Sequence, residues 1–364
     1  MRILVGMPEQ GSRGGPAACE PPFIAELRRL GHEVEDEVYA FSDSSAGLAG
    51  RVSRVLRTRR KFQQRAVKGA FDLIHINTSF DPKALLRDSA VLTGLKTSDA
   101  KIFLKFHGGD TELLKTTNPL LAVARNRVLA NADGIGLLSS EEQSNFATAG
   151  IPEDKLFVIK NVVEENRAEP APDFRQQLNL FGDVPLLLFI GRFIPAKGLI
   201  DAIRACALLQ VRGAQFHLLC IGDGPARQEA EDEVARLNLK DSIRFFGYIP
   251  EGETAKFYSN CDLLVFPTYH YEGFPMVIFN AAAAGLPIIT TRIRAAADYL
   301  QEPENCLWVE PKNPEMLAEK INAVLSDSKL CSKMRANNKF LAARFSAPMV
   351  TREYVAAYER LLSR

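Results

Sequence analysis

Short apolar runs alternate with segments of helical periodicity along the chain, and several of these runs are apolar throughout. This pattern is typical of buried strands in a parallel sheet that helices cover on both faces. In the first half, the predicted strands are Ile3–Met7, Leu73–Asn77, Ile102–Phe106, Gly134–Ser139 and Leu156–Lys160. In the second half, they are Leu186–Gly191, Phe216–Ile221, Ile243–Phe246, Leu263–Pro267 and Pro287–Thr290.

A polar, proline-containing stretch, Glu164–Asp173, separates the two runs of alternation. Two successive runs indicate an α/β fold with two doubly wound, Rossmann-like domains, joined by a linker near residues 164–180. Helical spacing also marks Pro22–Leu30, which ends before Gly31, and the last segment, Met349–Leu362. The pattern alone does not say where this last segment packs.

Composition limits the classes of protein that the chain can belong to. Its 364 residues suit two domains, and its formal net charge of +1 argues against binding of a polyanion by the chain as a whole. No apolar run is long enough to cross a bilayer, and the apolar run at Met1–Gly6 is too short for a signal peptide. The six cysteines are scattered without a Cys-x-x-Cys pair, which favours a reduced, cytosolic protein with buried thiols.

Two basic residues follow the predicted strand Leu186–Gly191. Arg192 comes directly after it, and Lys197 begins the next helix. Ligands of doubly wound sheets bind beyond the carboxyl ends of the strands, where both side chains would project. A guanidinium fork and a mobile ammonium suit a diphosphate and would stabilise the charge on a departing nucleotide. The alternative is a pair of solvated charges on a loop.

A glycine-containing turn precedes a predicted helix over Met276–Ala284, and its residues are Glu272, Gly273, Phe274 and Pro275. Backbone N–H groups at a helix N-terminus attract phosphate, and a carboxylate such as that of Glu272 can accept hydrogen bonds from sugar hydroxyls. The alternative role for Glu272 is that of a helix-capping acid. Gly222 lies in a further strand-to-helix turn on the same rim, and a turn that binds no ligand is its alternative.

The combination of these segments resembles glycosyltransferase family 4, which contains retaining enzymes of the GT-B type. The resemblance covers nearly the whole chain. It rests on Gly191-Arg192 with Lys197-Gly198, on Glu272–Pro275, on Ala284–Pro287, and on Phe245–Pro250 with Tyr248, which resembles the segment whose backbone meets the nucleotide base. Cys306 lies in Glu304–Val309, which resembles the strand that follows these motifs.

The resemblance implies two Rossmann-like domains that face a central cleft. The first is an acceptor-binding domain over residues 1–165, completed by a C-terminal helix over 347–364, and the second is a nucleotide-sugar-binding domain over 166–346. Gly14 and Gly15 resemble the loop that approaches the donor phosphate and the acceptor. His107 resembles the histidine of the family's His-Gly segment, near the transferred sugar or acceptor. Its alternative is a buried, hydrogen-bonded histidine at a strand end.

The sequence departs from the family pattern at one important position. The second glutamate of the paired-glutamate motif falls at position 280, where this chain has Asn280. In the family, that glutamate accepts hydrogen bonds from the ribose hydroxyls. An amide oxygen can still accept, but the loss of a charge-assisted bond would cost about 1 kcal/mol or more of donor affinity. Asn161-Val162 and Thr291–Asp298 also depart from the usual glycine-containing pattern.

The resemblance implies a retaining hexosyltransferase of cell-surface polysaccharide biosynthesis, with Glu272, Arg192, Lys197 and His107 as its catalytic residues. The donor is a nucleotide-sugar, with UDP favoured over GDP, and the acceptor is a glycan or a polyprenol-linked precursor. No Asp-x-Asp pair occurs, which favours transfer without a metal or other cofactor. A GT-B sugar-nucleotide epimerase and a non-catalytic nucleotide-sugar-binding protein are the alternatives, and Asn280 supports the second.

A basic stretch over residues 51–68 contains eight basic residues and no acid, with apolar residues between them. On a helix, this pattern gives a basic and partly apolar surface that suits anionic lipid headgroups. We therefore expect a cytoplasmic protein that associates peripherally with the inner face of the membrane. A solvated helix face or loop is the alternative. The chain has no nucleic-acid-binding motif, so we expect no nucleic acid partner.

Overall fold

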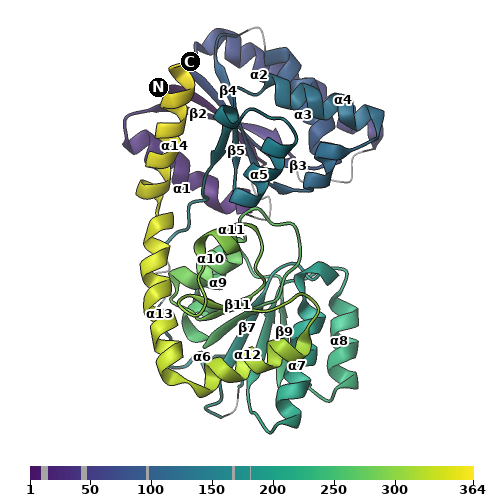
Figure 1. Ribbon diagram of the computed structural model, residues 1–364, viewed down its shortest axis with the longest axis vertical. Helices are drawn as coiled ribbons and strands as arrows, with labels where there is room; N and C mark the ends of the chain where they lie inside the picture. The colour runs from purple at the N-terminus through teal and green to yellow at the C-terminus, as the bar shows by residue number, and fades with distance from the viewer. Residues whose placement is uncertain (10–14, 42–46, 96–97, 166–168, 181) are drawn as a thin grey trace. The chain divides into compact units, whose positions relative to one another are not determined.

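The computed structural model describes residues 1–9, 15–41, 47–95, 98–165, 169–180 and 182–364. The chain forms two compact units (Figure 1). The first contains residues 1–162, 271–274 and 347–364, and the second contains 163–270 and 275–346. The division therefore falls three residues before the expected border at 165, and the short segment 271–274 groups with the first unit.

The first unit is built on a six-stranded parallel sheet with the order β2-β1-β3-β4-β5-β6. Its strands are β1 (Arg2–Pro8), β2 (Glu33–Ala40), β3 (Leu73–Phe80), β4 (Lys101–Gly109), β5 (Gly134–Leu137) and β6 (Leu156–Val158). Its helices are α1 (Gly15–Arg29), α2 (Leu48–Gly69), α3 (Pro82–Leu95), α4 (Pro119–Asn131), α5 (Ser140–Thr148) and α14 (Ala347–Leu362), with 3₁₀ turns η1 (Thr111–Lys115) and η2 (Glu153–Lys155).

The second unit repeats this architecture with the strand order β12-β11-β10-β7-β8-β9, again all parallel. Its strands are β7 (Leu186–Ile190), β8 (His217–Ile221), β9 (Ile243–Gly247), β10 (Leu263–Phe266), β11 (Ile288–Thr290) and β12 (Cys306–Trp308). Its helices are α6 (Phe174–Gln177), α7 (Leu199–Val211), α8 (Arg227–Arg236), α9 (Glu251–Asn260), α10 (Met276–Ala283), α11 (Arg294–Tyr299), α12 (Pro314–Ser326) and α13 (Ser328–Ala342), with 3₁₀ turns η3 (Pro195–Lys197) and η4 (Ala343–Phe345).

Every strand that the apolar pattern predicts is present, but the pattern missed two. Strand β12 was expected only from the family resemblance. Strand β2 is an edge strand whose first five residues include four acids, Glu33, Glu35, Asp36 and Glu37, so it lacks an apolar run. Charged side chains are common on edge strands because they discourage pairing with other chains. Glu37 is nevertheless buried, because Lys61 and Arg65 of α2 pair with it.

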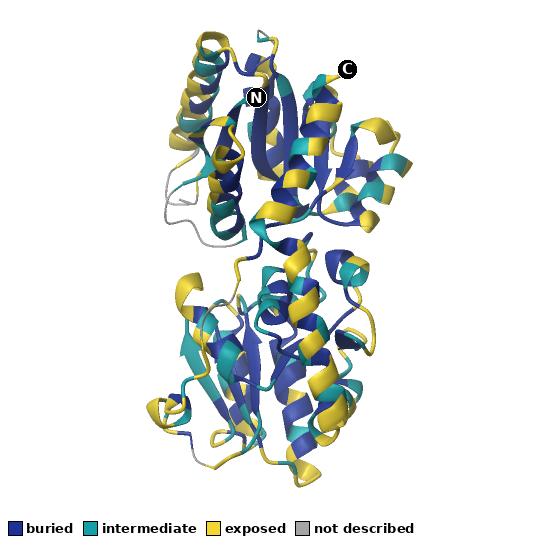
Figure 2. Ribbon diagram, turned by 90° about the vertical axis from the view of Figure 1, so that its left-hand side faces the viewer, coloured by how far each residue is buried: buried dark blue, intermediate teal, exposed yellow. Residues whose placement is uncertain are grey.

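The strands of each sheet are largely buried between helices, and the outer faces of those helices are exposed (Figure 2). In the first unit, Ile74 and Ile76 of β3 join an apolar cluster with residues of α2, α3 and α4. The alternate residues of β3 point to the opposite face, where α14 packs against α1. There the rings of Phe23 and Tyr354 lie 4.5 Å apart. The last helix of the chain is thus part of the first unit.

All six cysteines are free thiols, and five of them are buried. Within the described residues, no helix is both long and apolar enough to span a bilayer.

The loops at the carboxyl ends of β7, β8 and β9 are tied together by backbone hydrogen bonds. The N–H of Phe193 donates to Asp223 over 2.9 Å, and the N–H of Gly222 donates to Gly247 over 2.8 Å. Gly222 has a φ of 136°, and a Cβ there would lie 1.8 Å from the carbonyl oxygen of Gly191. A side chain at position 222 would therefore force these loops apart.

We expect Gly222→Ala to lower the free energy of unfolding by about 3 kcal/mol or more, since it adds overpacking to the cost of a left-handed backbone. Gly213→Ala is the matched control, because Gly213 also has a positive φ, of 80°, but nothing within 4 Å of its Cβ position. The Gly213→Ala variant should lose about 1 kcal/mol of the free energy of unfolding. Denaturant unfolding of both variants measures the difference, and equal losses would contradict the steric argument.

Candidate functional site

Four basic side chains gather at the carboxyl edge of the second sheet. Arg192 follows β7, Lys197 ends η3, His270 follows β10 and Arg294 begins α11. Burial and the charge of Arg192 lower the pKa of Lys197 to about 7. Burial, with the charges of Lys197, Arg192 and Arg294, lowers the pKa of His270 to about 4. Neutral pH thus leaves His270 uncharged in a strongly positive field, which favours binding of an anion.

Hydrogen bonds fix the backbone beneath this basic cluster. The N–H of Tyr269 donates to the carbonyl oxygen of Ala196 over 2.8 Å, and the hydroxyl of Thr268 donates to the same oxygen over 3.3 Å. The Lys197 ammonium lies 5.3 Å from the centroid of the Phe266 ring. Lys197 is thus a buried lysine whose position is set by the loop after β10, rather than a solvated charge on a mobile chain.

Asn280, the departure from the family pattern, lies on α10 and contacts Glu251 at the start of α9. Its amide nitrogen donates to a carboxylate oxygen of Glu251 over 3.0 Å. Burial raises the pKa of Glu251, although the bond from Asn280 opposes the shift. A carboxylate therefore lies beside the position at which the sequence lacks one.

The other residues that the sequence assigns to the donor site lie on several loops and helix ends. Gly222 lies in the tied loops, and Tyr248 follows β9 with 47 % of the residue's surface exposed. Pro275 is the N-cap residue of α10 and makes no side-chain capping hydrogen bond. Gly15 is the first residue of α1, whereas Gly14 lies outside the described residues.

Glu272, Gly273 and Phe274 belong to the segment that groups with the first unit. Glu272 forms an antiparallel bridge with Gly108, at the end of β4. Gly108 has a φ of 111°, and a Cβ there would lie 2.7 Å from the backbone nitrogen of Gly273. Only glycine fits this approach, so the structure brings Glu272 to the same strand end as His107.

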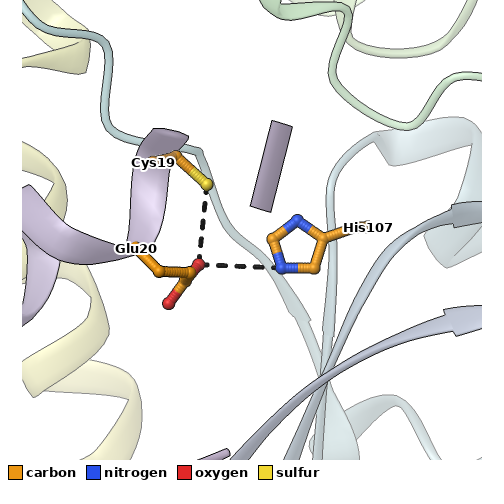
Figure 3. Close-up of side chains that lie close together, drawn as sticks. All are labelled: Cys19, Glu20 and His107. Atoms are coloured by element: carbon orange, nitrogen blue, oxygen red, sulfur yellow. Dashed lines mark hydrogen bonds and ion pairs between the residues drawn. The ribbon is translucent and has the colours of Figure 1, made fainter. Parts of the chain in front are cut away.

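A buried ion pair lies below His107 in the first unit. The Lys105 ammonium of β4 donates to a carboxylate oxygen of Glu20 on α1 over 2.6 Å, and both side chains are fully enclosed. Burial alone would raise the pKa of Glu20, but the charge and hydrogen bond of Lys105, together with His75 and His107, outweigh it and hold that pKa well below its usual value. The imidazole of His107 lies 3.6 Å from the same oxygen (Figure 3).

Asn77 of β3 joins this pair to His107. Its amide nitrogen donates to the other carboxylate oxygen of Glu20 over 3.0 Å, and its amide oxygen lies 2.7 Å from Nε2 of His107. Burial and the charge of Lys105 lower the pKa of His107 well below its usual value. The ring is therefore neutral at pH 7, and the alternative of a buried, hydrogen-bonded histidine holds for its Nε2 atom.

The sequence reasoning missed Glu20, Asn77, Lys105, His75 and Tyr358. One signal was available in each of two strands: polar residues interrupt the apolar runs of β3 and β4, as in the Leu-Ile-His-Ile-Asn order at Leu73–Asn77. A polar residue inside a buried strand requires a buried partner. The partners lie on α1 and α14, far away in sequence, so the pattern could not name them.

Cys19, Glu20 and His107 lie close enough to be considered as metal ligands, with one donor atom of each within 4.8 Å of the others. The donor set does not fit a metal well. Lys105 already neutralises Glu20, Nε2 of His107 faces the amide oxygen of Asn77, and burial raises the pKa of the Cys19 thiol. Metals bind thiolates and lone pairs rather than protonated donors. The chemistry of these three side chains therefore argues against a metal site.

Two family models match the chain. The model for Glycosyltransferase Family 4 matches residues 22–167, and the model for glycosyl transferases group 1 matches residues 170–340. The first match covers most of the described first unit, and the second covers the basic cluster, the tied loops and Asn280.

Curated relatives and solved structures agree with these models. The chain is 29 % identical over 254 residues to 2-deoxystreptamine glucosyltransferase of Streptomyces kanamyceticus, covering 68 % of this chain and 65 % of that protein. It is 26 % identical over 226 residues to N,N'-diacetylbacillosaminyl-diphospho-undecaprenol alpha-1,3-N-acetylgalactosaminyltransferase of Campylobacter jejuni, covering 58 % of this chain and 56 % of that protein. The aligned part is thus less than two thirds of either relative.

The structure of HepE from Anabaena in complex with UDP superposes with a TM-score of 0.78 at 22 % identity, covering 98 % of this chain and 99 % of that one. A likeness at this identity establishes the fold, which is the GT-B class of two Rossmann-like domains. Together with the two family models, it shows that this chain belongs to the family 4, group 1 glycosyltransferases.

Proposed function

We propose that this protein is a retaining, metal-independent hexosyltransferase. It moves a hexose from a nucleotide-sugar, a UDP-sugar rather than a GDP-sugar, to a glycan or polyprenol-linked acceptor in cell-surface polysaccharide biosynthesis. The observation that carries the proposal is the cluster of Arg192, Lys197 and Arg294 around the neutral His270 at the carboxyl edge of the second sheet. Open α/β sheets bind their ligands at this edge.

The proposed donor is inferred from the positive charge of Arg192 and Lys197 and from the nucleotide that a structural neighbour binds. Arg192 and Lys197 hold the diphosphate and stabilise the charge that develops on it, a role that a metal fills in other transferases. For the remainder of the donor, the family resemblance predicts contacts from Gly222, Tyr248, Pro275 and Asn280, and it predicts the same role for Gly14, Gly15, Gly273 and Phe274. UDP is favoured because HepE is described in complexes with UDP and UDP-glucose.

The proposed reaction breaks the bond between the anomeric carbon and the diphosphate oxygen. An acceptor hydroxyl attacks the same face of the sugar, and its proton passes to the departing diphosphate, so configuration is retained. Glu272 holds the sugar hydroxyls and His107 contacts the sugar or acceptor. The acceptor class is suggested by the Campylobacter jejuni relative, whose name specifies a diphospho-undecaprenol acceptor.

A non-catalytic nucleotide-sugar-binding protein is the second candidate, since Asn280 stands where the family has an acid. The test incubates radiolabelled UDP-glucose, UDP-galactose and GDP-mannose with the protein and a membrane extract that contains acceptors. We expect transfer by the wild type and a loss of about 100-fold or more in Glu272→Ala, with UDP binding retained. Glu253→Ala, on the exposed surface of α9, is the control. Binding without turnover would favour the second candidate.

The low pKa of Lys197 makes donor affinity depend on pH. Above pH 7 the free protein loses the Lys197 proton, and a bound diphosphate must recover it, so affinity falls by up to about tenfold per pH unit. The terminal phosphate of UDP has completed its ionisation by then. We expect the Kd of UDP, measured by calorimetry, to rise by about an order of magnitude or more between pH 7 and 9.

Lys197→Arg is the control for this dependence, because a guanidinium stays charged throughout that range. Its Kd should be nearly constant from pH 7 to 9, even where its absolute affinity is lower. Parallel pH curves for the wild type and the variant would contradict the assignment of Lys197 to the diphosphate.

The basic stretch forms helix α2 of the first unit, so the alternative of a loop is wrong. Its outer side carries three exposed apolar residues, Val52, Leu56 and Val67. These are at helical spacing and would enter the headgroup region of a bilayer, with basic side chains around them. We propose that this side docks on the anionic cytoplasmic surface of the membrane that holds a polyprenol-linked acceptor.

The structure separates two groups of basic residues on α2. Lys61 and Arg65 pair with acids of β2, whereas Arg57, Arg60 and Lys68 are exposed beside the apolar stripe. At about 1 kcal/mol for each basic residue, Arg57→Ser with Arg60→Ser and Lys68→Ser should weaken binding to vesicles by about 100-fold. Flotation with phosphatidylserine–phosphatidylcholine vesicles measures this.

The control for vesicle binding removes the same number of charges elsewhere. Lys83→Ser, Lys240→Ser and Lys329→Ser also remove three exposed lysines, none of them on α2. This variant should float like the wild type. Equal behaviour of the two triple variants would leave the helix without a role in docking.

A further inference from the structure

The orientation of the Asn77 amide is fixed by its neighbours. One terminal atom lies 3.2 Å from the carbonyl oxygen of Gly6, which can only accept a hydrogen bond, so this atom must be the NH₂ group. The same group donates to Glu20 over 3.0 Å. The other terminal atom is therefore the oxygen, and it faces Nε2 of His107 at 2.7 Å.

This orientation determines the tautomer of His107. An amide oxygen accepts hydrogen bonds, so the Nε2 atom that faces it must carry a proton. Burial, with Lys105 nearby, keeps the ring neutral, and a neutral imidazole has one N–H only. Nδ1 of His107 therefore presents a lone pair.

Nδ1 of His107 is buried and has no hydrogen-bond partner among the described residues. The His107 side chain as a whole is only 7 % exposed. An unpartnered acceptor in such an enclosed position costs free energy unless a ligand supplies a donor. The expected donor is an O–H group, because the neutral lone pair accepts a hydrogen bond and does not attract an anion.

A second strand residue supports Asn77 from the other side. Nε2 of His75 lies 3.3 Å from the same amide oxygen, and Nδ1 of His75 is hydrogen-bonded to the hydroxyl of Tyr358 on α14. Burial lowers the pKa of His75 to about 4, so this ring is also neutral. The Tyr358 hydroxyl donates to His75, which donates to Asn77, and the chain of bonds joins α14 to His107.

We propose that Asn77 is a positioning residue that fixes His107 as the Nε2–H tautomer, so that its Nδ1 atom accepts a hydrogen bond from a hydroxyl of the sugar donor or acceptor. Glu20 and Gly6 set the orientation of Asn77, and Tyr358 holds it through His75. Only the identity of the ligand rests on the proposed function; the tautomer is a property of the free protein.

A comparable buried cluster in the same unit shows what a purely structural network looks like. Asp88 of α3 is fully enclosed and accepts hydrogen bonds from Tyr39 over 2.8 Å and from Thr78 over 2.5 Å, with Arg87 at 2.7 Å. Within the described residues, the side chains of this cluster leave no buried polar atom unsatisfied. The cluster around His107 differs in the single acceptor that it leaves open.

The first test measures the tautomer directly in the full chain. The protein has five histidines, so selective ¹⁵N labelling and two-bond ¹H–¹⁵N spectra resolve each ring, with His107 assigned through its substitution. At pH 7 without any ligand, we expect protonated Nε2 and unprotonated Nδ1 in His107. A protonated Nδ1, or a charged ring, would overturn the proposal whether or not the protein transfers sugar.

Variants then assign the cause. In Asn77→Leu the amide oxygen that accepts from Nε2 is lost, so His107 should become a mixture of both tautomers. Tyr358→Phe should change the His75 signals and broaden those of His107. Tyr39→Phe removes a comparable buried hydroxyl from the Asp88 cluster and should leave both rings unchanged. An unaltered His107 in Asn77→Leu would show that Asn77 does not position it.

The last test compares the kcat of two variants to show which ring nitrogen of His107 contacts the ligand. An asparagine amide oxygen, which is an acceptor, stands as many bonds from Cα as Nδ1 does, and a glutamine amide nitrogen, which is a donor, stands as many as Nε2. His107→Asn therefore keeps an acceptor for the ligand, and His107→Gln keeps the bond to Asn77 instead. We expect His107→Gln to lose about tenfold more kcat than His107→Asn. The reverse order would overturn the assignment of Nδ1 to the ligand.

Discussion

The buried ion pair between Glu20 and Lys105 is the interaction on which the first unit's candidate site depends. Neither side chain reaches solvent, and removing one partner of such a pair costs about 3–5 kcal/mol because the other charge is left uncompensated. The pair connects α1 with β4, and the Glu20 carboxylate also holds the amide of Asn77. The protonation state and orientation of His107 both follow from this arrangement.

The candidate site of the second unit brings like charges close together. In the first unit each buried charge of the Glu20–Lys105 pair has an opposite partner at hydrogen-bonding distance. In the second, Lys197 lies near Arg192, and these two with Arg294 act together on His270. Like charges raise each other's free energy, so their proximity is stable only when the fold holds them or an anion joins them. Backbone hydrogen bonds that join the loop after β7 to the loops after β8 and β10 supply the first of these conditions.

The sequence predicted the parts of the structure that depend on local chemistry. The runs of apolar residues identify the strands, and Arg192 and Lys197 could be placed because the carboxyl edge of a parallel sheet is known from topology alone. The edge strand β2 was missed because four acids among its first five residues leave it without an apolar run. The Glu20–Lys105 pair was missed for another reason: its members are 85 residues apart, and no periodicity relates them.

The structure gives Asn280, which departs from the family pattern, a role that the sequence alone does not suggest. From the sequence alone, the missing acid is a loss of charge in the donor site. In the structure, Asn280 donates to Glu251 over 3.0 Å, and burial already raises the pKa of that carboxyl. A glutamate at position 280 would place a second carboxylate beside Glu251 and raise that pKa further through like-charge repulsion. An amide can donate to the acid instead, so Asn280 and Glu251 form a donor–acceptor pair where a glutamate at position 280 would add a further negative charge.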